Sequence, residues 1–163
     1  MQIKTVEVDS ITHDPANVRT HAERNIEAIK ASLNRFGQQK PIVVDSKGVV
    51  VAGNGTLQAA KALGWSQIKI IRTDLEKADA IAFAIADNRT AELAEWDDKA
   101  LVEQLNALQI QDENLLTAAG FNDDELGALV DASIRGIGAE ELNTEDYSEF
   151  KTECPKCGFG WND

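Results

Sequence analysis

The chain of 163 residues lacks long hydrophobic runs and lacks the pattern of a secretory leader. A membrane span needs roughly 18 consecutive apolar residues, and no stretch approaches this length. No segment near the N-terminus joins a basic start to an apolar run, as a signal peptide does. With 43% hydrophobic and 27% charged residues, the sequence predicts a cytoplasmic globular protein with no membrane partner.

Positive charge is scarce after residue 72. Residues 1–72 carry ten Lys or Arg against six Asp or Glu, and the remainder carries six against twenty-two, so the two parts have net charges of +4 and −16. The first part could face a phosphate-bearing ligand, whereas the second is equally consistent with a solvated helical surface. Because no basic helix-turn-helix is present, autonomous sequence-specific DNA binding is disfavoured.

Cysteine is limited to Cys154 and Cys157, which have the spacing of a zinc knuckle. One Cys-x-x-Cys supplies only half of a tetrahedral Zn²⁺ site. Three alternatives stay open: zinc held across a homodimer, a reduced pair without metal, or a redox pair. The redox reading is the weakest, since no thioredoxin-like pattern surrounds the pair. His13 and His21 are the only histidines, and nothing in the sequence places them near the tail.

Hydrophobic periodicity predicts strands and helices in alternation over the first half of the chain. The expected strands are residues 2–8, 41–45, 49–52 and 68–71. The expected helices are residues 22–36, 56–63 and 75–86, followed by shorter helices at 98–108, 114–119 and 123–130. Gly37 is placed to end the first helix, and Asp97 and Asn122 or Asp123 are placed to cap later ones. Residues 136–153 are polar and acidic, which is typical of a flexible linker.

The segment 49–64, VVVAGNGTLQAAKALG, reads as a strand, a glycine turn and a helix. Such a junction directs unpaired N–H groups and the positive end of a helix dipole at one point, which favours a phosphate. Gly53 and Gly55 permit positive φ angles, and Asn54 or Thr56 could cap the helix or bond a phosphate oxygen. No Lys-Ser/Thr follows the glycines, so the turn is not a Walker motif. A turn that needs glycine for geometry alone is the competing interpretation.

The order of these elements, together with four short motifs, resembles the ParB/sulfiredoxin superfamily over residues 3–97. The motifs are Asn17-Val18-Arg19, Phe36-Gly37, Lys40 to Val44, and Val51 to Ala60. Asp87-Asn88-Arg89 resembles the third box of ParB-type domains. The resemblance implies an α+β fold, with a small mixed sheet and flanking helices in residues 1–97. An acidic helical extension at 98–135 and a linker with the Cys-x-x-Cys tail at 136–163 would follow.

The resemblance also implies that the chain binds a nucleotide, ATP or CTP with Mg²⁺. Its implied phosphate cradle is the turn formed by Gly53, Asn54, Gly55 and Thr56. Lys40 would reach in from the start of a strand. From the next helix, Asn88 and Arg89 would approach the nucleotide and its metal, and Asp87 is the candidate carboxylate for the metal. Glu92, Glu95, Asp97 and Asp98 are further carboxylates nearby, and such a cluster is more often solvated surface.

The turn departs from the pattern of its relatives in three positions. ParB proteins carry Gly-Glu-Arg-Arg and sulfiredoxins Gly-Cys-His-Arg, whereas this chain has Gly53-Asn54-Gly55-Thr56. Sulfiredoxin chemistry is therefore excluded. CTP hydrolysis by the ParB route is disfavoured, because Asn54 cannot act as a general base and the turn offers no arginine. We expect nucleotide binding without efficient turnover.

Three functions follow from the sequence. The first is a nucleotide-binding module acting in phage or mobile-element DNA modification, partition or regulation. The second is a metal-dependent nuclease or phosphotransferase that uses Asp87. The third is a non-catalytic adaptor for a DNA methyltransferase or another DNA enzyme, in which the glycine turn is scaffold. DNA or a DNA-processing protein, and a second copy of the chain, are the expected macromolecular partners.

Overall fold

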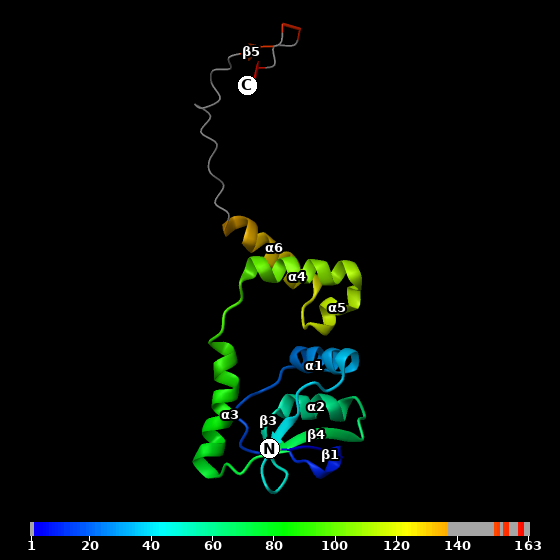
Figure 1. The fold of residues 1–163 in the computed structure, drawn as a ribbon, viewed down its shortest axis with the longest axis vertical. Helices are drawn as coiled ribbons and strands as arrows, with labels where there is room; N and C mark the ends of the chain where they lie inside the picture. The colour runs from blue at the N-terminus through cyan, green and yellow to red at the C-terminus, as the bar shows by residue number, and fades with distance from the viewer. Residues whose placement is uncertain (1, 137–151, 154, 157–159, 162–163) are drawn as a thin grey trace.

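The computed structural model describes residues 2–136, 152–153, 155–156 and 160–161. Its first half contains β1 (Ile3–Glu7), a 3₁₀ turn η1 (Val8–Ser10), α1 (Glu23–Phe36), β2 (Ile42–Val44), β3 (Val50–Ala52), α2 (Asn54–Ala62), β4 (Gln67–Arg72) and α3 (Lys77–Glu92). Its second half contains α4 (Asp98–Gln111), α5 (Glu113–Ala118), α6 (Asp123–Gly136), β5 (Thr152–Glu153) and β6 (Gly160–Trp161). Figure 1 shows this path, with α3 beside the sheet and α4 to α6 beyond α1.

The main sheet has four strands in the order β1-β4-β2-β3. β4 pairs antiparallel with β1 and parallel with β2, and β2 and β3 form an antiparallel hairpin. In the hairpin loop, one carboxylate oxygen of Asp45 accepts hydrogen bonds from the N–H groups of Lys47 and Val49, each at 2.8 Å. Gly48 completes the turn with φ 87°. The predicted α+β fold with a small mixed sheet is confirmed.

Two apolar clusters connect the sheet to two layers of helix. Leu57 and Ala60 of α2 pack with buried residues of β2, β3 and β4, including Val44, Val50 and Ile70. The opposite side of α2 packs on α1 through the second cluster, which consists of Ile26, Leu33 and Ala59. Trp65 contacts both clusters, so it closes the core after α2 as a packing residue. The sheet, α2 and α1 therefore form successive layers (Figure 1).

The helices α4, α5 and α6 have an apolar cluster of their own around Leu105, Leu116 and Leu126. They dock on the outer side of α1, where Arg35 pairs with Asp112 at 2.9 Å and Arg24 pairs with Glu125. Ion pairs thus join residues 1–72, which carry a net charge of +4, to the later part of the chain, which carries −16. Within the described residues, no helix combines the length and the apolar character that a membrane span requires.

Helix starts and ends mostly follow the predicted capping signals. Gly37 ends α1 with φ 67°, and the Asp97 side chain accepts from Ala100 N–H at 3.0 Å. Of the two candidates at α6, Asn122 is the cap: its Oδ1 accepts from Glu125 N–H at 2.8 Å, while Glu125 Oε2 accepts from Asn122 N–H at 3.0 Å. This reciprocal pair is a capping box.

Several predicted helix boundaries are wrong, including the ends of α4, at Gln111 rather than residue 108, and of α6, at Gly136 rather than residue 130. α2 begins at Asn54 rather than Thr56, because Gly53, with φ 104°, is its N-cap and Leu57 N–H donates to Gly53 O. Asn54 and Gly55 therefore belong to the helix, and only Gly53 of the two glycines has a positive φ. α3 continues to Glu92 rather than ending at Ala86, because no glycine or proline interrupts it. None of the apolar residues of α3 is buried, and Ile81 is 62% exposed.

The predicted linker at 136–153 falls mainly on residues 137–151, outside the described residues. At its ends, Gly136 is the last residue of α6, and Thr152–Glu153 forms a short strand that pairs antiparallel with β6. Cys154 and Cys157, the candidate zinc ligands, also lie outside the described residues. The zinc hypothesis therefore stays a prediction.

Candidate functional site

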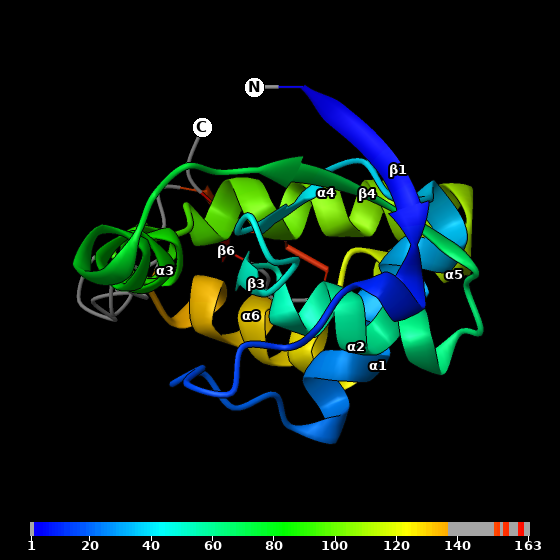
Figure 2. The same ribbon diagram turned by 90° about the horizontal axis from the view of Figure 1, so that it is seen from below.

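A cavity of about 320 Å³ lies where five segments meet. Its lining residues come from the loop 14–21, Ile29 of α1, the start of β2, the junction between β3 and α2, and one side of α3. Figure 2 shows that α3 stands beside β3 and apart from α1 and α2. The start of α2 and one side of α3 both line the cavity. Lys40, Gly53, Asn54, Gly55, Thr56, Asp87 and Asn88, all predicted site residues, line it.

The turn before α2 is fixed by close packing. Gly53 adopts the left-handed conformation, and a Cβ on it would lie 2.6 Å from Ile42 Cγ2, so no side chain fits here. Asn54 and Gly55 are buried in the first turn of α2. The N–H groups of Asn54, Gly55 and Thr56 precede the first intrahelical donor, so they are available to a ligand at the positive end of the helix.

Asn54 does not cap α2, contrary to one predicted role. Its Oδ1 instead accepts a hydrogen bond from the N–H of Asp14 at 3.2 Å. This bond joins residues 40 positions apart and holds the loop 14–21 against the start of α2. Asn54 therefore has a structural role at the cavity, because its side-chain oxygen is already hydrogen-bonded.

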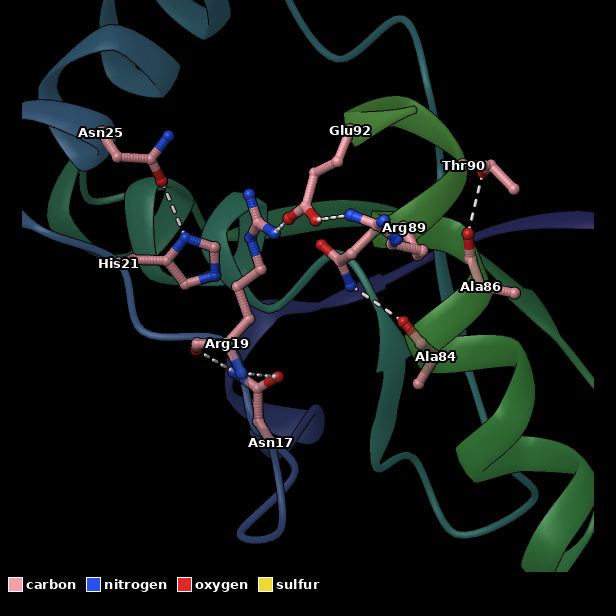
Figure 3. Close-up of polar contacts among 10 residues, drawn as sticks. Asn17, Arg19, His21, Asn25, Ala84, Ala86, Arg89, Thr90 and Glu92 are labelled. Atoms are coloured by element: carbon pink, nitrogen blue, oxygen red, sulfur yellow. Dashed lines mark hydrogen bonds and ion pairs between the residues drawn. The ribbon is translucent and has the colours of Figure 1, made fainter. Parts of the chain in front are cut away.

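Short-range polar contacts shape the loop 14–21. Asp14 Oδ1 accepts from Ala16 N–H at 2.8 Å, Asn17 Nδ2 donates to Arg19 O at 2.7 Å, and Arg19 N–H donates to Asn17 Oδ1 at 3.3 Å. Figure 3 shows the two bonds between Asn17 and Arg19, and the Arg19 side chain extending from the loop toward Glu92 of α3. The Asn17-Val18-Arg19 motif thus forms a turn from which the Arg19 guanidinium reaches α3.

Ion pairs connect α3 to the rest of the cavity. Lys40 Nζ lies 3.7 Å from Asp87 Oδ1, and Arg19 pairs with Glu92. Arg89 is not among the cavity-lining residues: it pairs with Glu92 Oε2 at 3.4 Å, with 60% of its side chain exposed. Asn88 Nδ2 donates to Ala84 O at 2.8 Å, within its own helix.

Glu92 neutralises two arginines at once. The hydrogen bond from Arg19, and after it the one from Arg89, holds the pKa of the Glu92 carboxyl below its ordinary value of 4.5. Glu92 therefore occupies guanidinium groups that an incoming anion would also attract.

Arg19 and His21 were not predicted from the sequence as site residues. The signal for Arg19 was the Asn-x-Arg motif, whereas His21 had none.

The described residues do not form a metal site of their own. In residues 2–136 and the short tail segments, no three His, Cys, Asp or Glu side chains converge as metal ligands. The carboxylates of Glu92, Glu95, Asp97 and Asp98 are thus not gathered into one site. Asp87 lines the cavity beside the phosphate-favouring turn, as does Asp14 of the loop, and Mg²⁺ commonly takes one or two carboxylates plus phosphate oxygens.

A family model described as the ParB N-terminal domain matches residues 1–89. The ParB-like nuclease domain-containing protein YnaK of Escherichia coli K12 is 33% identical over 55 residues, 34% of this chain and 63% of the relative. The probable chromosome-partitioning protein ParB of Campylobacter jejuni is 28% identical over 91 residues, 53% of this chain and 33% of the relative. The chain therefore spans less than two thirds of both.

The fold also matches a solved structure. The C-terminally truncated chromosome-partitioning protein ParB of Caulobacter crescentus, complexed with CTP-γ-S, superposes with a TM-score of 0.65. The match covers 82% of this chain and 87% of that chain, at 18% sequence identity. The similarity thus extends beyond the residues that the family model matches.

Proposed function

The chain belongs to the ParB N-terminal domain family, and from this premise we propose that its cavity binds a nucleoside triphosphate, CTP or ATP, with Mg²⁺. One observation carries the proposal: the cavity joins the open N-terminus of α2 to Lys40 and to Asp87 and Asn88 of α3. The Caulobacter crescentus structure with CTP-γ-S supports the choice of ligand class.

The phosphate group is the part of the ligand that this cavity suits best. The N–H groups at the start of α2 and the helix dipole attract an anion, and the buried position of Asn54 and Gly55 keeps these donors in place. Lys40 adds a mobile positive charge, since its side chain is 86% exposed. A volume near 320 Å³ lies at the lower end of ligand pockets, which run from about 300 to 1,000 Å³.

The nucleoside part would rest on apolar surface. Ile81 and Ile85 of α3 are largely exposed, yet both line the cavity, so their exposure faces the space that a ligand would fill. Burial of aliphatic surface against a base or a ribose is favourable at about 25 cal/mol per Å². This arrangement also accounts for the apolar positions that α3 leaves outside the protein core.

Binding without efficient turnover is the activity that we propose. Asn54 is an amide whose oxygen holds the Asp14 N–H, so it cannot take a proton from water. Asp87, the one acidic group on α3 that lines the cavity, is engaged by Lys40. Because Asn54 cannot act as a general base and the turn offers no arginine, the turn works as a holder of phosphates.

The setting that we propose is phage or mobile-element DNA modification, partition or regulation. The Campylobacter jejuni relative, a probable chromosome-partitioning protein, supports a role linked to DNA. Residues 97–136 carry nine Asp or Glu against two Lys or Arg. A surface of this charge repels DNA, which supports contact with DNA through a partner protein.

A thermal-shift titration with CTP or ATP and Mg²⁺ tests the proposal. We expect the nucleotide to raise the melting temperature, and Lys40→Ala to weaken the affinity about tenfold, because a hydrogen bond to a charged group contributes about 1.5–3 kcal/mol. Lys47→Ala, in the hairpin away from the cavity, is the matched control and should bind as the wild type does. If no nucleotide shifts the wild type, the non-catalytic adaptor becomes the better account.

A second candidate is a metal-dependent nuclease or phosphotransferase. It is favoured by the position of Asp87 in the cavity and by the nuclease domain in the name of the Escherichia coli relative. Its test is Mg²⁺-dependent nicking of DNA or release of nucleotide products that disappears in Asp87→Ala and persists in Asp131→Ala, a change on the distant α6. Absence of both activities in the wild type would exclude this candidate.

A further inference from the structure

The first turn of α2 has a gap in its side-chain layer, and a ring from another segment fills it. A Cβ built on Gly55 would lie 2.8 Å from Cε1 and 3.0 Å from Nδ1 of His21, and 3.0 Å from Ile29 Cδ1. Gly55 has no positive φ, so its backbone would accept any residue. A side chain at position 55 would therefore displace the His21 imidazole and the end of Ile29, which occupy this space.

The ring is held in one orientation. His21 Nδ1 lies 2.7 Å from Asn25 Oδ1, on the first turn of α1. Figure 3 shows this nitrogen facing Asn25 and the second ring nitrogen on the opposite side of the ring. His21 is half-buried and lines the cavity. With Nδ1 committed to Asn25, Nε2 is the nitrogen that a ligand can use.

We infer that His21 is a phosphate-binding residue of this cavity, supplying from the loop the basic group that position 55 lacks. The inference rests on the proposed nucleotide site. In the imidazolium form both nitrogens donate, Nδ1 to Asn25 and Nε2 to a phosphate oxygen. The ring lies in van der Waals range of Gly55, so its charge adds to that of the N–H groups at the start of α2.

Because only an imidazolium ring donates from both of its nitrogens, the proposed contact predicts that phosphate binding depends on pH. The other charged groups that line the cavity are Asp14 and Arg19 on the same loop, Lys40 before β2 and Asp87 on α3; α1 and α2 contribute Asn25 and backbone N–H groups near the ring. Histidine is the side chain whose charge ordinarily changes between about pH 5 and 8. Phosphate affinity should therefore fall as the pH rises through this range.

Calorimetric titration of the full chain with CTP and Mg²⁺ at about pH 6 and about pH 8 tests the inference. We expect His21→Ala to weaken binding about tenfold at the lower pH, and to flatten the pH dependence that the wild type shows. Gly55→Ala should cause a similar loss, because the new Cβ displaces the ring. His13→Ala, which changes the other histidine outside the cavity, should bind as the wild type does.

The double variant sharpens the test. If Gly55→Ala acts only by moving His21, then it should cause no further loss of CTP affinity in a chain that already carries His21→Ala. Equal CTP affinity of the wild type and His21→Ala, or equal pH slopes, would overturn the inference while the nucleotide site stands. Additive losses in the double variant would also overturn it. A wild-type chain that binds neither CTP nor ATP would overturn the inference and the proposed function together.

Discussion

The two helices that wall the cavity, α2 and α3, are built in opposite ways. Of the nine residues of α2, five are buried, and its side chains belong to two apolar clusters. None of the sixteen residues of α3 is buried. A wall that is part of the core holds its N–H groups in fixed positions, whereas a wall without core contacts can move when a ligand enters. The fixed wall is suited to phosphates and the loose wall to closing over the nucleoside.

Two ion pairs, in addition to its contacts with β3, attach the loose wall, α3, to the rest of the protein. Lys40–Asp87 and Arg19–Glu92 connect it to the rest of the cavity, and exposed ion pairs of this kind contribute only about 0–1 kcal/mol each. Lys40 and Arg19 are also cations that a phosphate would attract. A bound triphosphate would therefore compete with Asp87 and Glu92, so that binding and the position of α3 are coupled.

Truncation of the core of α2 should give the largest effect. Leu57→Ala should lower the free energy of unfolding by about 3 kcal/mol, because Leu57 is fully buried between the sheet and α2. Ile81→Ala on α3 should change it by less than about 1 kcal/mol, since Ile81 is 62% exposed. Urea denaturation measures both. A similar loss in the two variants would contradict the contrast between the walls.

Substitution of the turn glycine should give the next largest effect. Gly53→Ala should cost about 2–3 kcal/mol, from left-handed strain and from the contact of the new Cβ with Ile42. Gly64→Ala is the matched control: its φ of 71° is also positive, but its Cβ would meet nothing within 4 Å. It should cost only about 1 kcal/mol. Equal unfolding free energies for the two variants would show that the turn is not held by packing on β2.

Removal of the charge on Glu92 should give the smallest effect on stability and a measurable effect on binding. Because the folded-state pKa of Glu92 is lowered, its contribution is present above pH 4.5 and is lost as the pH falls through the lowered pKa. In Glu92→Gln, the urea concentration at the midpoint of unfolding should no longer include this contribution, so it should fall less than that of the wild type as the pH is lowered. It should also strengthen CTP binding a few-fold, about the value of an exposed ion pair, by freeing Arg19. Unchanged or weaker CTP binding in Glu92→Gln would contradict the competition.

The sequence predicted the environment of α2, the fixed wall, better than that of α3, the loose wall. Strand alternation, the helical face of residues 26, 29 and 33, and the glycine turn are local patterns, and each corresponds to an observed element. The apolar positions of α3 have the same helical spacing as a core helix. Periodicity could not distinguish a face turned to the core from one turned to a ligand cavity.

The contacts that shape the cavity could not be predicted, because they join distant residues. Asp14 and Asn54 are 40 positions apart, and Arg19 and Glu92 are 73 apart. Glycine at position 55 was predicted to provide a positive φ, whereas it provides room for His21. A residue that is required to be small gives no indication, in a single sequence, of what fills the space beside it.

The central claim is that phosphates bind at the start of α2. Backbone amide resonances recorded during titration with CTP and Mg²⁺ test it most directly. The account predicts that the largest shifts occur at Asn54, Gly55 and Thr56, with smaller shifts along α3 and little change in α4 to α6. Shifts that spare residues 54–56, or that concentrate in the acidic helices α4 to α6, would contradict it.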